Sequence, residues 1–246
     1  LSTKELCLDS IRLQIKGIEL SVCAGETIGL AGMEGSGQAL FLSSCAGLER
    51  AVSGSVCLDD KDMTHYTHHD FKRRGVAYLP AARLEEGLVP GLSLSDHFIL
   101  SEGEGGIFID KRGADERAKA RIAAFNIKGR PDSPVEALSG GNQQRALLAL
   151  LKEELSLILI EHPTRGLDIE STAYIWSKLK ERCAKGAAIV FISADLDEIL
   201  QYSDRVVVFF AGRVSPPLEA EGLSASDLGR LIGGKGWERF EESIHA

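Results

Sequence analysis

No apolar run in this sequence is long enough to cross a lipid bilayer. The longest ones, such as VVVFFA at 206–211, fall far short of the roughly 20 residues that a membrane-spanning helix needs. A surplus of basic residues is also absent, because 28 lysines and arginines stand against 36 aspartates and glutamates and give a net charge of −8. The sequence therefore predicts neither a membrane-spanning protein nor one that mainly binds the phosphate backbone of nucleic acid.

Paired cysteine motifs and targeting signals are missing as well. The five cysteines are widely spread and contain no CxxC, which indicates buried thiols in a reducing compartment. The first residues, LSTKEL, include no initiator methionine, basic segment or apolar segment, so they show no secretion signal, and we expect the chain to be a piece of something longer. At 246 residues, the chain can bury a substantial core without disulfides or metals.

Short strand-like runs alternate with helical patterns along the chain. The early runs are punctuated by glycine and aspartate and predict a small mixed sheet: 5–9, 17–22, 27–32 and 53–60. The later runs are continuously apolar, as expected for strands buried on both faces: 157–160, 188–193 and 205–211. Helical stretches separate these later strands, so the sequence predicts an α/β fold with a parallel sheet.

Three helical patterns fall between the early and the late strands, at 93–100, 110–127 and 139–155. Ser93 and Ser139 are the expected N-caps of two of these helices. We interpret residues 84–150 as a helical subdomain inserted into the α/β core. The end of the chain, from about 233 to 246, is expected to be flexible.

A glycine-rich loop follows the strand predicted at 27–32. Its sequence, GMEGSGQALF, fits the spacing GxxxxGK[ST], with Gln38 in place of the lysine and Ala39 in place of the hydroxyl residue. Glycines there let backbone N–H groups converge on phosphate oxygens at a helix N-terminus. A glycine turn without any ligand is the alternative for this motif taken alone. The predicted nucleotide-binding residues are Gly32, Gly35, Ser36, Gly37, Gln38 and Ala39.

A second anion site is predicted where ALSGGNQQRALLAL, residues 137–150, begins an amphipathic helix. Ser139 supplies a hydroxyl, and Gly140 and Gly141 supply unhindered backbone amides at the helix start.

A third motif, LILIEHPTRGLD at 157–168, places Glu161 and His162 at the end of a buried strand. A carboxylate in that position, beside a phosphate-binding loop, is typical of a Mg²⁺ ligand.

In this order, the three motifs resemble those of the ATP-binding cassette ATPases of ABC transporters. GMEGSGQA looks like their Walker A motif, LSGGNQQR like their signature motif, and LILIEHPTRGLD like Walker B followed by the D-loop with Asp168. The variant SGGNQQ together with PTRGLD is most similar to the second, C-terminal cassette of tandem ATPases of simple-sugar importers (ribose, galactose or xylose type) or nucleoside importers. The resemblance covers roughly residues 5–215.

The resemblance implies a P-loop NTPase of the ABC ATPase type. Such a protein has a parallel sheet core, a small antiparallel β subdomain and an inserted helical subdomain, here in a single domain that spans residues 1–246. It also implies a peripheral location on the cytoplasmic face of the plasma membrane, with integral membrane permease subunits as partners and no nucleic acid. Val89 and its neighbours Leu88 and Leu92 are candidate contacts to those subunits, with burial inside the helical subdomain as the alternative.

Several positions that carry out hydrolysis in this family are changed in the chain. His162 replaces the glutamate that acts on the attacking water, and Glu161 is one methylene longer than the usual Walker B aspartate. We therefore expect no intact catalytic residue, and Glu161 is the remaining candidate for a metal ligand. His162 as a rescuing general base is the alternative. The changed positions are Gln38, Ala39, Ala81, Ala82, Glu161, His162 and Ala194.

The signature motif is unchanged, and in the resembling family it acts on another cassette. Cassettes pair head to tail, so that the signature of one covers the ATP bound to the Walker A motif of the other. The resemblance thus implies that four residues complete the site of a competent partner cassette: Ser139, Gly140, Gly141 and Gln143. ATP and Mg²⁺ would be cofactors of the assembled transporter, with weak or no binding at this chain's own loop.

Two functions remain open at this stage. The first is an importer cassette that is degenerate at its own site, has no or very weak ATPase activity alone, and lends its signature motif to a partner. The second is a non-transport regulatory or interaction module that has kept the cassette fold. Association with membrane subunits is expected only for the first.

Overall fold

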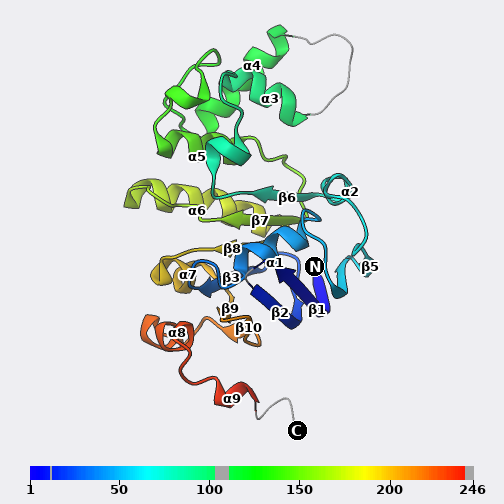
Figure 1. Cartoon of the computed structure of the whole chain (residues 1–246). Coiled ribbons are helices and arrows are strands. Elements are labelled where there is room, and N and C mark those ends of the chain that lie inside the picture. Colours follow the sequence, from blue (N-terminus) through cyan, green and yellow to red (C-terminus); the bar gives the residue numbers. More distant parts are fainter. Residues whose placement is uncertain (12, 103–110, 242–246) are drawn as a thin grey trace. The chain divides into compact units, whose positions relative to one another are not determined.

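The structure is a computed structural model that describes residues 1–11, 13–102 and 111–241 (Figure 1). Contacts divide the chain into two compact units, each of which is described by itself. The sheet unit comprises Leu1–Tyr78, Leu155–His162 and Lys180–Ala246. The helical unit comprises Leu79–Glu154 and Pro163–Leu179, so the subdomain predicted at 84–150 lies within it.

A largely parallel sheet forms the centre of the sheet unit. Within the described part of the chain its strand order is β10-β9-β3-β8-β7-β6, and β11 also pairs with β9. β8 runs parallel to both β3 and β7, and β9 runs parallel to β3. The continuously apolar runs at 157–160, 188–193 and 205–211 and the earlier run at 27–32 all form strands of this sheet, which confirms the predicted α/β fold. The strands are β3 (Thr27–Gly32), β6 (Val76–Leu79), β7 (Leu157–Glu161), β8 (Ala188–Ile192), β9 (Arg205–Phe210), β10 (Arg213–Val214) and β11 (Leu218–Glu219).

The parallel pairing brings the carboxyl ends of β3, β7 and β8 to one edge of the sheet. Each of these strands is followed by a segment with predicted site residues. The glycine loop follows β3, His162 follows β7, and the segment with Ala194 follows β8. Ligands of open α/β sheets bind at this edge, because the connecting loops and the helix N-termini meet there.

A smaller antiparallel sheet packs into the same core. Its order is β2 (Leu13–Ser21), β1 (Ser2–Ser10), β4 (Ser53–Leu58) and β5 (Lys61–Asp62). Alternate residues such as Leu6, Leu8, Ile18 and Leu20 are buried, because successive side chains of a strand point to opposite faces. They join Phe41 of helix α1 (Gln38–Cys45) in one hydrophobic cluster, which fixes α1 directly behind the glycine loop.

The helical unit is built around the helices that the sequence pattern predicted. These are α3 (Leu94–Glu102), α4 (Lys111–Ala124) and α5 (Gly140–Ala149), with a π-type turn η1 (Arg83–Gly87), a 3₁₀ turn η2 (Val135–Ala137) and the first part of α6 (Ile169–Ala184). Ser93 caps α3, because its hydroxyl accepts the Asp96 N–H while the Asp96 carboxylate accepts the Ser93 N–H. Ser139 occupies the N-cap position of α5 as predicted.

The last part of the described chain packs against the sheet unit. Beyond α8, the Trp237 side chain is 4% exposed, its Nε1 donates to the Leu231 carbonyl at 2.8 Å, and the Arg213 guanidinium lies 4.8 Å from its ring centroid. The expected flexible end at 233 does not fit this packing, and residues 242–246 lie outside the described residues.

The other helices are α2 (His68–Arg73), α7 (Leu196–Tyr202), α8 (Ala225–Ile232) and α9 (Glu238–Glu241). No helix among the described residues is long and apolar enough to span a bilayer.

All five cysteines are described and free, but they differ in exposure. Cys45 and Cys183 are buried, Cys7 and Cys57 are half-buried, and Cys23 is exposed. The prediction of buried thiols therefore holds for two of them. Burial raises the pKa of the Cys45 thiol to about 12, so this side chain is a neutral, small apolar group in the core.

Candidate functional site

The glycine loop turns directly from β3 into α1. Gly35 and Gly37 have φ angles of +82° and +116°, a region that residues with a Cβ rarely adopt. A Cβ on Gly37 would also lie 2.2 Å from Ile15, so this position needs glycine for space as well as for conformation. The loop thus requires glycine at these positions and leads directly into α1, where the sequence predicts a phosphate-binding loop.

The Gln38 side chain folds back over the loop. It is 4% exposed, and its Nε2 lies 2.2 Å from the point where a Cβ on Gly32 would stand. A neutral amide is therefore packed against Gly32, where β3 ends and the loop begins. Ala39, the next residue of α1, is exposed and presents only a methyl group.

The carboxylate of Glu161 has a partner inside the sheet unit. The Tyr78 hydroxyl donates to Glu161 Oε1 at 2.6 Å, from the neighbouring strand β6. The same hydroxyl lies 3.5 Å from Ser43 Oγ of α1, which links the strand end to the helix behind the loop. Tyr78 was not among the predicted site residues. The sequence offers no motif for it, because its role depends on β6 lying beside β7.

His162 stands directly after β7, and Ala194 stands close after β8. His162 leaves the strand with φ +49° and its N–H donates to the Ile192 carbonyl at 2.8 Å. Beyond β8, the buried Ser193 hydroxyl donates to the Glu198 carboxylate, and Ala194 is exposed with no polar side-chain atom. The side chains that follow these two strands at His162 and Ala194 are therefore an imidazole and a methyl group.

This edge of the sheet does not fit a Mg²⁺ site. The Ala39 side chain supplies no oxygen, Gln38 packs a neutral amide against Gly32, and Glu161 already accepts a hydrogen bond from Tyr78. Mg²⁺ requires several oxygen ligands in near-octahedral geometry. The described residues also contain no group of three or more His, Cys, Asp or Glu side chains arranged to hold a metal ion.

In the helical unit, the start of α5 is open. Ser139 and Gly140 are exposed, and the Ser139 side chain does not accept from the amides of the first helical turn. A Cβ on Gly140 would lie 3.1 Å from an Arg83 nitrogen, and one on Gly141 would lie 3.2 Å from Leu167. The two glycines therefore let other parts of the unit approach the helix start closely and leave its amides uncovered.

Gln143 and Asn142 make different contacts at the start of α5. Gln143 is 8% exposed, and its amide nitrogen donates to the carbonyls of Val135 and Leu138. It thus holds the turn before α5 and does not reach out of the unit. Asn142, which was not predicted, contacts Ser139 directly: Asn142 Nδ2 donates to Ser139 Oγ at 2.8 Å.

Arg83 is a second residue that lies near the signature motif and that the sequence motifs do not indicate. Its Nε donates to Gln144 Oε1 at 2.7 Å, and its Nη2 donates to the carbonyl of Arg165. Burial, followed by the nearby charge of Arg165, lowers the pKa of the Arg83 guanidinium. The positive Arg83 side chain therefore lies close to the start of α5, where it favours an anion.

Asp168 directly precedes α6, and its carboxylate is bonded to the first turn of that helix. Its carboxylate accepts from the Ser171 N–H at 2.8 Å and from the Ser171 hydroxyl at 2.9 Å. These two hydrogen bonds lower the pKa of Asp168. The hydroxyl of Ser171 in turn accepts from Arg145 at 2.9 Å, so the predicted D-loop residue is tied to α5.

The segment predicted to contact membrane subunits is only partly exposed. Leu88 is 3% exposed and belongs to the core of the helical unit, whereas Val89 is 50% exposed. The Val89 N–H donates to Nε2 of the buried His97, whose Nδ1 lies 2.7 Å from the Ser93 carbonyl. This geometry fixes the loop before α3 and leaves Val89 as its outward apolar side chain.

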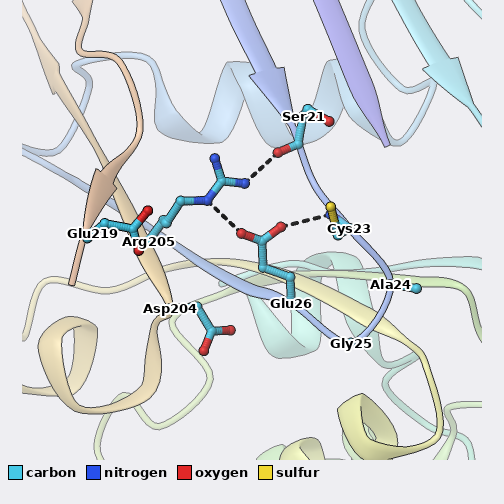
Figure 2. A pocket seen from close by; sticks show the side chains of 8 residues that line it. All are labelled: Ser21, Cys23, Ala24, Gly25, Glu26, Asp204, Arg205 and Glu219. Atoms are coloured by element: carbon cyan, nitrogen blue, oxygen red, sulfur yellow. Dashed lines mark hydrogen bonds and ion pairs between the residues drawn. The ribbon is translucent and has the colours of Figure 1, made fainter. Parts of the chain in front are cut away.

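A shallow pocket of about 650 Å³ lies at the opposite edge of the sheet, near the first residues of β3 and β9. Figure 2 shows Arg205 between the Glu26 carboxylate and the Ser21 carbonyl, with bonds of 2.6 Å and 2.7 Å. Cys23 donates its N–H to the same carboxylate at 2.8 Å. The six residues of β3 separate this pocket from the glycine loop by about 20 Å, so it is no part of the predicted nucleotide site.

The Glu26–Arg205 pair is expected to make stability depend on pH. Burial alone raises the pKa of Glu26, but the bonds from Arg205 and from the Cys23 N–H outweigh it, and the net pKa is lowered. A carboxyl group whose pKa is lower in the folded than in the unfolded state stabilises the protein fully at pH values above the unfolded pKa of about 4.3. This stabilisation is lost as the pH falls through the pKa of the folded state.

Urea unfolding of Glu26→Gln should test this dependence. At pH 7 the variant should be less stable than wild type by about 1–2 kcal/mol, and the difference should shrink below about pH 4. The matched control is Asp132→Asn, which removes one partner of the exposed pair Arg130–Asp132 and should leave stability unchanged. An undiminished difference between wild type and Glu26→Gln at pH 3 would contradict the assignment.

Comparison with known families and curated proteins gives a consistent result. The family described as ABC transporter matches residues 15–165. The nucleoside import ATP-binding protein NupA of Lactococcus lactis is 32% identical over 244 residues, which is 95% of this chain and 48% of that protein. The ribose import protein RbsA of Corynebacterium glutamicum is 32% identical, and the match covers 86% of this chain and 41% of that protein. An arabinose import protein, AraG of Burkholderia pseudomallei, is 34% identical, with 89% and 44% covered. The chain thus spans about half the length of the curated relatives it matches.

Solved structures share the fold at lower identity. The ATP-binding subunit of an ABC transporter superimposes with a TM-score of 0.78 at 22% identity, covering 94% of this chain and 98% of that chain. The dimeric cassette MJ0796 bound to ADP and phosphate gives a TM-score of 0.77 at 19% identity, covering 90% and 99%. At these identities the likeness shows the fold alone.

Proposed function

Because this chain belongs to the ABC transporter family, we propose that it is the ATP-binding cassette of a sugar-type or nucleoside-type importer whose own site has lost hydrolysis. It pairs with a competent cassette and lends that cassette its signature motif. As the chain corresponds to about half of its curated relatives, we further propose that it is the second cassette of a tandem ATPase, with the competent cassette in the same polypeptide or in a separate chain.

The asymmetry between the two predicted anion sites carries this proposal. At the chain's own loop, the amide of Gln38 covers Gly32, Ala39 has no hydroxyl, and the Glu161 carboxylate is bonded to Tyr78. At the start of α5, Ser139 and Gly140 are exposed and the amides of the first turn are uncapped. The first arrangement is closed to a metal–nucleotide complex, whereas the second is open to an anion from outside.

When its signature motif faces the ATP bound to the partner cassette, this chain would position the phosphates and stabilise their negative charge. The Ser139 hydroxyl and the amides of Gly140 and Gly141 would donate to phosphate oxygens of ATP held on the partner cassette. The positive charge of Arg83 beside Gly140 would add to the attraction. Closure of the two cassettes would then be passed to permease subunits at the cytoplasmic face of the membrane, in part through the exposed Val89.

Phosphate release by the purified chain tests the loss of hydrolysis. With ATP and Mg²⁺ the chain alone should give no turnover above a protein-free blank, because phosphoryl transfer depends on a positioned metal, ammonium and base. His162→Ala is the informative control, since a rescuing imidazole would make any residual rate sensitive to this change. Turnover at an ordinary rate, about 1 s⁻¹ or more, would refute the proposal.

Co-purification from native membranes separates the importer cassette from a regulatory module. An importer cassette should be recovered with integral membrane subunits. Recovery with only a soluble partner that lacks a phosphate-binding loop would favour the regulatory module.

A further inference from the structure

Asn142 holds two parts of the helical unit at once. Its Oδ1 accepts from the Lys128 N–H at 2.7 Å, and its Nδ2 donates to Ser139 Oγ at 2.8 Å. Lys128 belongs to the turn after α4, and Ser139 is the N-cap position of α5. The side chain of Asn142, in the first turn of α5, therefore ties the serine to a backbone amide that lies 14 residues before Asn142 in the sequence.

The backbone amide of Lys128 fixes which way the Asn142 amide faces. A backbone N–H can only donate, so it requires the carbonyl oxygen of the asparagine. The NH₂ group must then point at Ser139, whose oxygen becomes an acceptor. Among the described residues, nothing accepts the hydrogen of the Ser139 hydroxyl, and the serine is exposed. That hydrogen is consequently available to an acceptor outside the unit.

The Ser139 side chain also lacks the hydrogen bond that a serine at an N-cap position usually makes. An N-cap serine normally accepts from an amide of the first turn, which satisfies one of the unpaired helix donors. In this structure Ser139 makes no such bond, because Asn142 engages its oxygen instead. The hydroxyl hydrogen and the first amides of α5 are thus left together as unpaired donors.

We propose that Asn142 is a positioning residue that turns the Ser139 hydroxyl into an outward hydrogen-bond donor for a phosphate oxygen of a nucleotide bound on the partner cassette. This inference rests on the proposed lending function. The hydroxyl oxygen is held by Asn142, so its hydrogen is directed toward the incoming anion before the cassettes close. Such preorganisation lowers the cost of forming the bond at closure.

A double-mutant cycle on the intact transporter tests the inference. The readout is ATP-dependent closure, measured by FRET between labels on this cassette and its partner, with EDTA to prevent hydrolysis. Asn142→Ala should raise the ATP concentration needed for half-maximal closure about fivefold, as expected for one hydrogen bond of about 1 kcal/mol. In a Ser139→Ala background, the same change should have less than about a twofold effect, because the serine through which Asn142 acts is gone.

Asn142→Asp separates positioning from a purely structural role. The aspartate keeps an acceptor for Lys128 and the length of the side chain, but its second oxygen accepts the Ser139 hydrogen and reverses the bond. Closure should therefore be weakened at least as much as in Asn142→Ala, with an unchanged unfolding transition. Wild-type closure in Asn142→Asp, or equal effects of Asn142→Ala in both backgrounds, would overturn the inference.

Failure of the lending function itself gives a different pattern. If Ser139→Ala and Gly140→Asp both leave closure unchanged, the signature motif is not lent, and the proposed function fails. If these two variants weaken closure while the Asn142 variants do not, only the role of Asn142 is wrong.

Discussion

Gly140→Asp is expected to abolish ATP hydrolysis by the assembled transporter. Gly140 lies at the exposed start of α5, where a Cβ would come within 3.1 Å of Arg83. An aspartate there fills the space that a phosphate of the partner's ATP would occupy, repels it, and pairs with the arginine that would attract it. Loss of one preorganised donor in an oxyanion-type site costs roughly 100-fold or more in rate, and this variant removes several such interactions together.

The measurement is phosphate release by the purified assembly in membranes or nanodiscs. Ala123→Asp is the matched control, because it adds the same charge at an exposed position on α4 of the same helical unit and should leave the rate unchanged. Gly140→Ala should give an intermediate loss, since it adds only one methyl group. An assembly that keeps its full rate with Gly140→Asp does not use this signature motif.

Gln38→Lys combined with Ala39→Ser should restore nucleotide binding to the chain's own loop. The lysine returns an ammonium to the β- and γ-phosphates, and the serine returns a hydroxyl for Mg²⁺. A hydrogen bond to a charged group contributes about 1.5–3 kcal/mol, so each change should tighten binding at least tenfold, and both together about 100-fold. Ala39 is exposed, so the added hydroxyl meets no packing obstacle.

Calorimetric titration with ATP and Mg²⁺ measures this gain. Gln38→Met is the control, because it keeps the volume of the buried side chain without adding a charge, and it should not improve affinity. Hydrolysis should remain absent in the restored variant, since His162 and the Tyr78-bonded Glu161 are unchanged. Equal affinities of wild type and double variant would show that Gln38 and Ala39 do not limit binding.

The contacts and the burial of several side chains depend on the tertiary structure and cannot be inferred from residue type. Tyr78 sits in an ordinary apolar strand, and only the arrangement of β6 beside β7 brings its hydroxyl to Glu161. Leu88 and Val89 are adjacent and similar in chemistry, yet one is core and the other surface. A sequence motif cannot separate such cases, because they depend on which neighbour fills the space.

The C-terminal segment gives the clearest difference between expectation and structure. Glycines and charged residues in GGKGWERF favoured a flexible end, but Trp237 provides a large apolar ring that Arg213 and Phe210 cover. One aromatic side chain can offset the loss of chain entropy over several residues. Composition averages over a segment, whereas docking depends on a single well-placed residue.

The sequence by itself determined the α/β fold, the glycine loop and the serine–glycine start of α5. Continuous apolar runs force strands into a doubly covered sheet, and glycines permit only a few backbone shapes, so these features depend on local chemistry. Only the tertiary structure decided which polar side chains are committed inside the protein and which face outward. Gln143 and Asn142 are neighbours of similar chemistry, yet Gln143 binds carbonyls within the unit while Asn142 binds Ser139. A hydrogen bond needs a partner at the right distance and angle, and residues far apart in the sequence supply that partner.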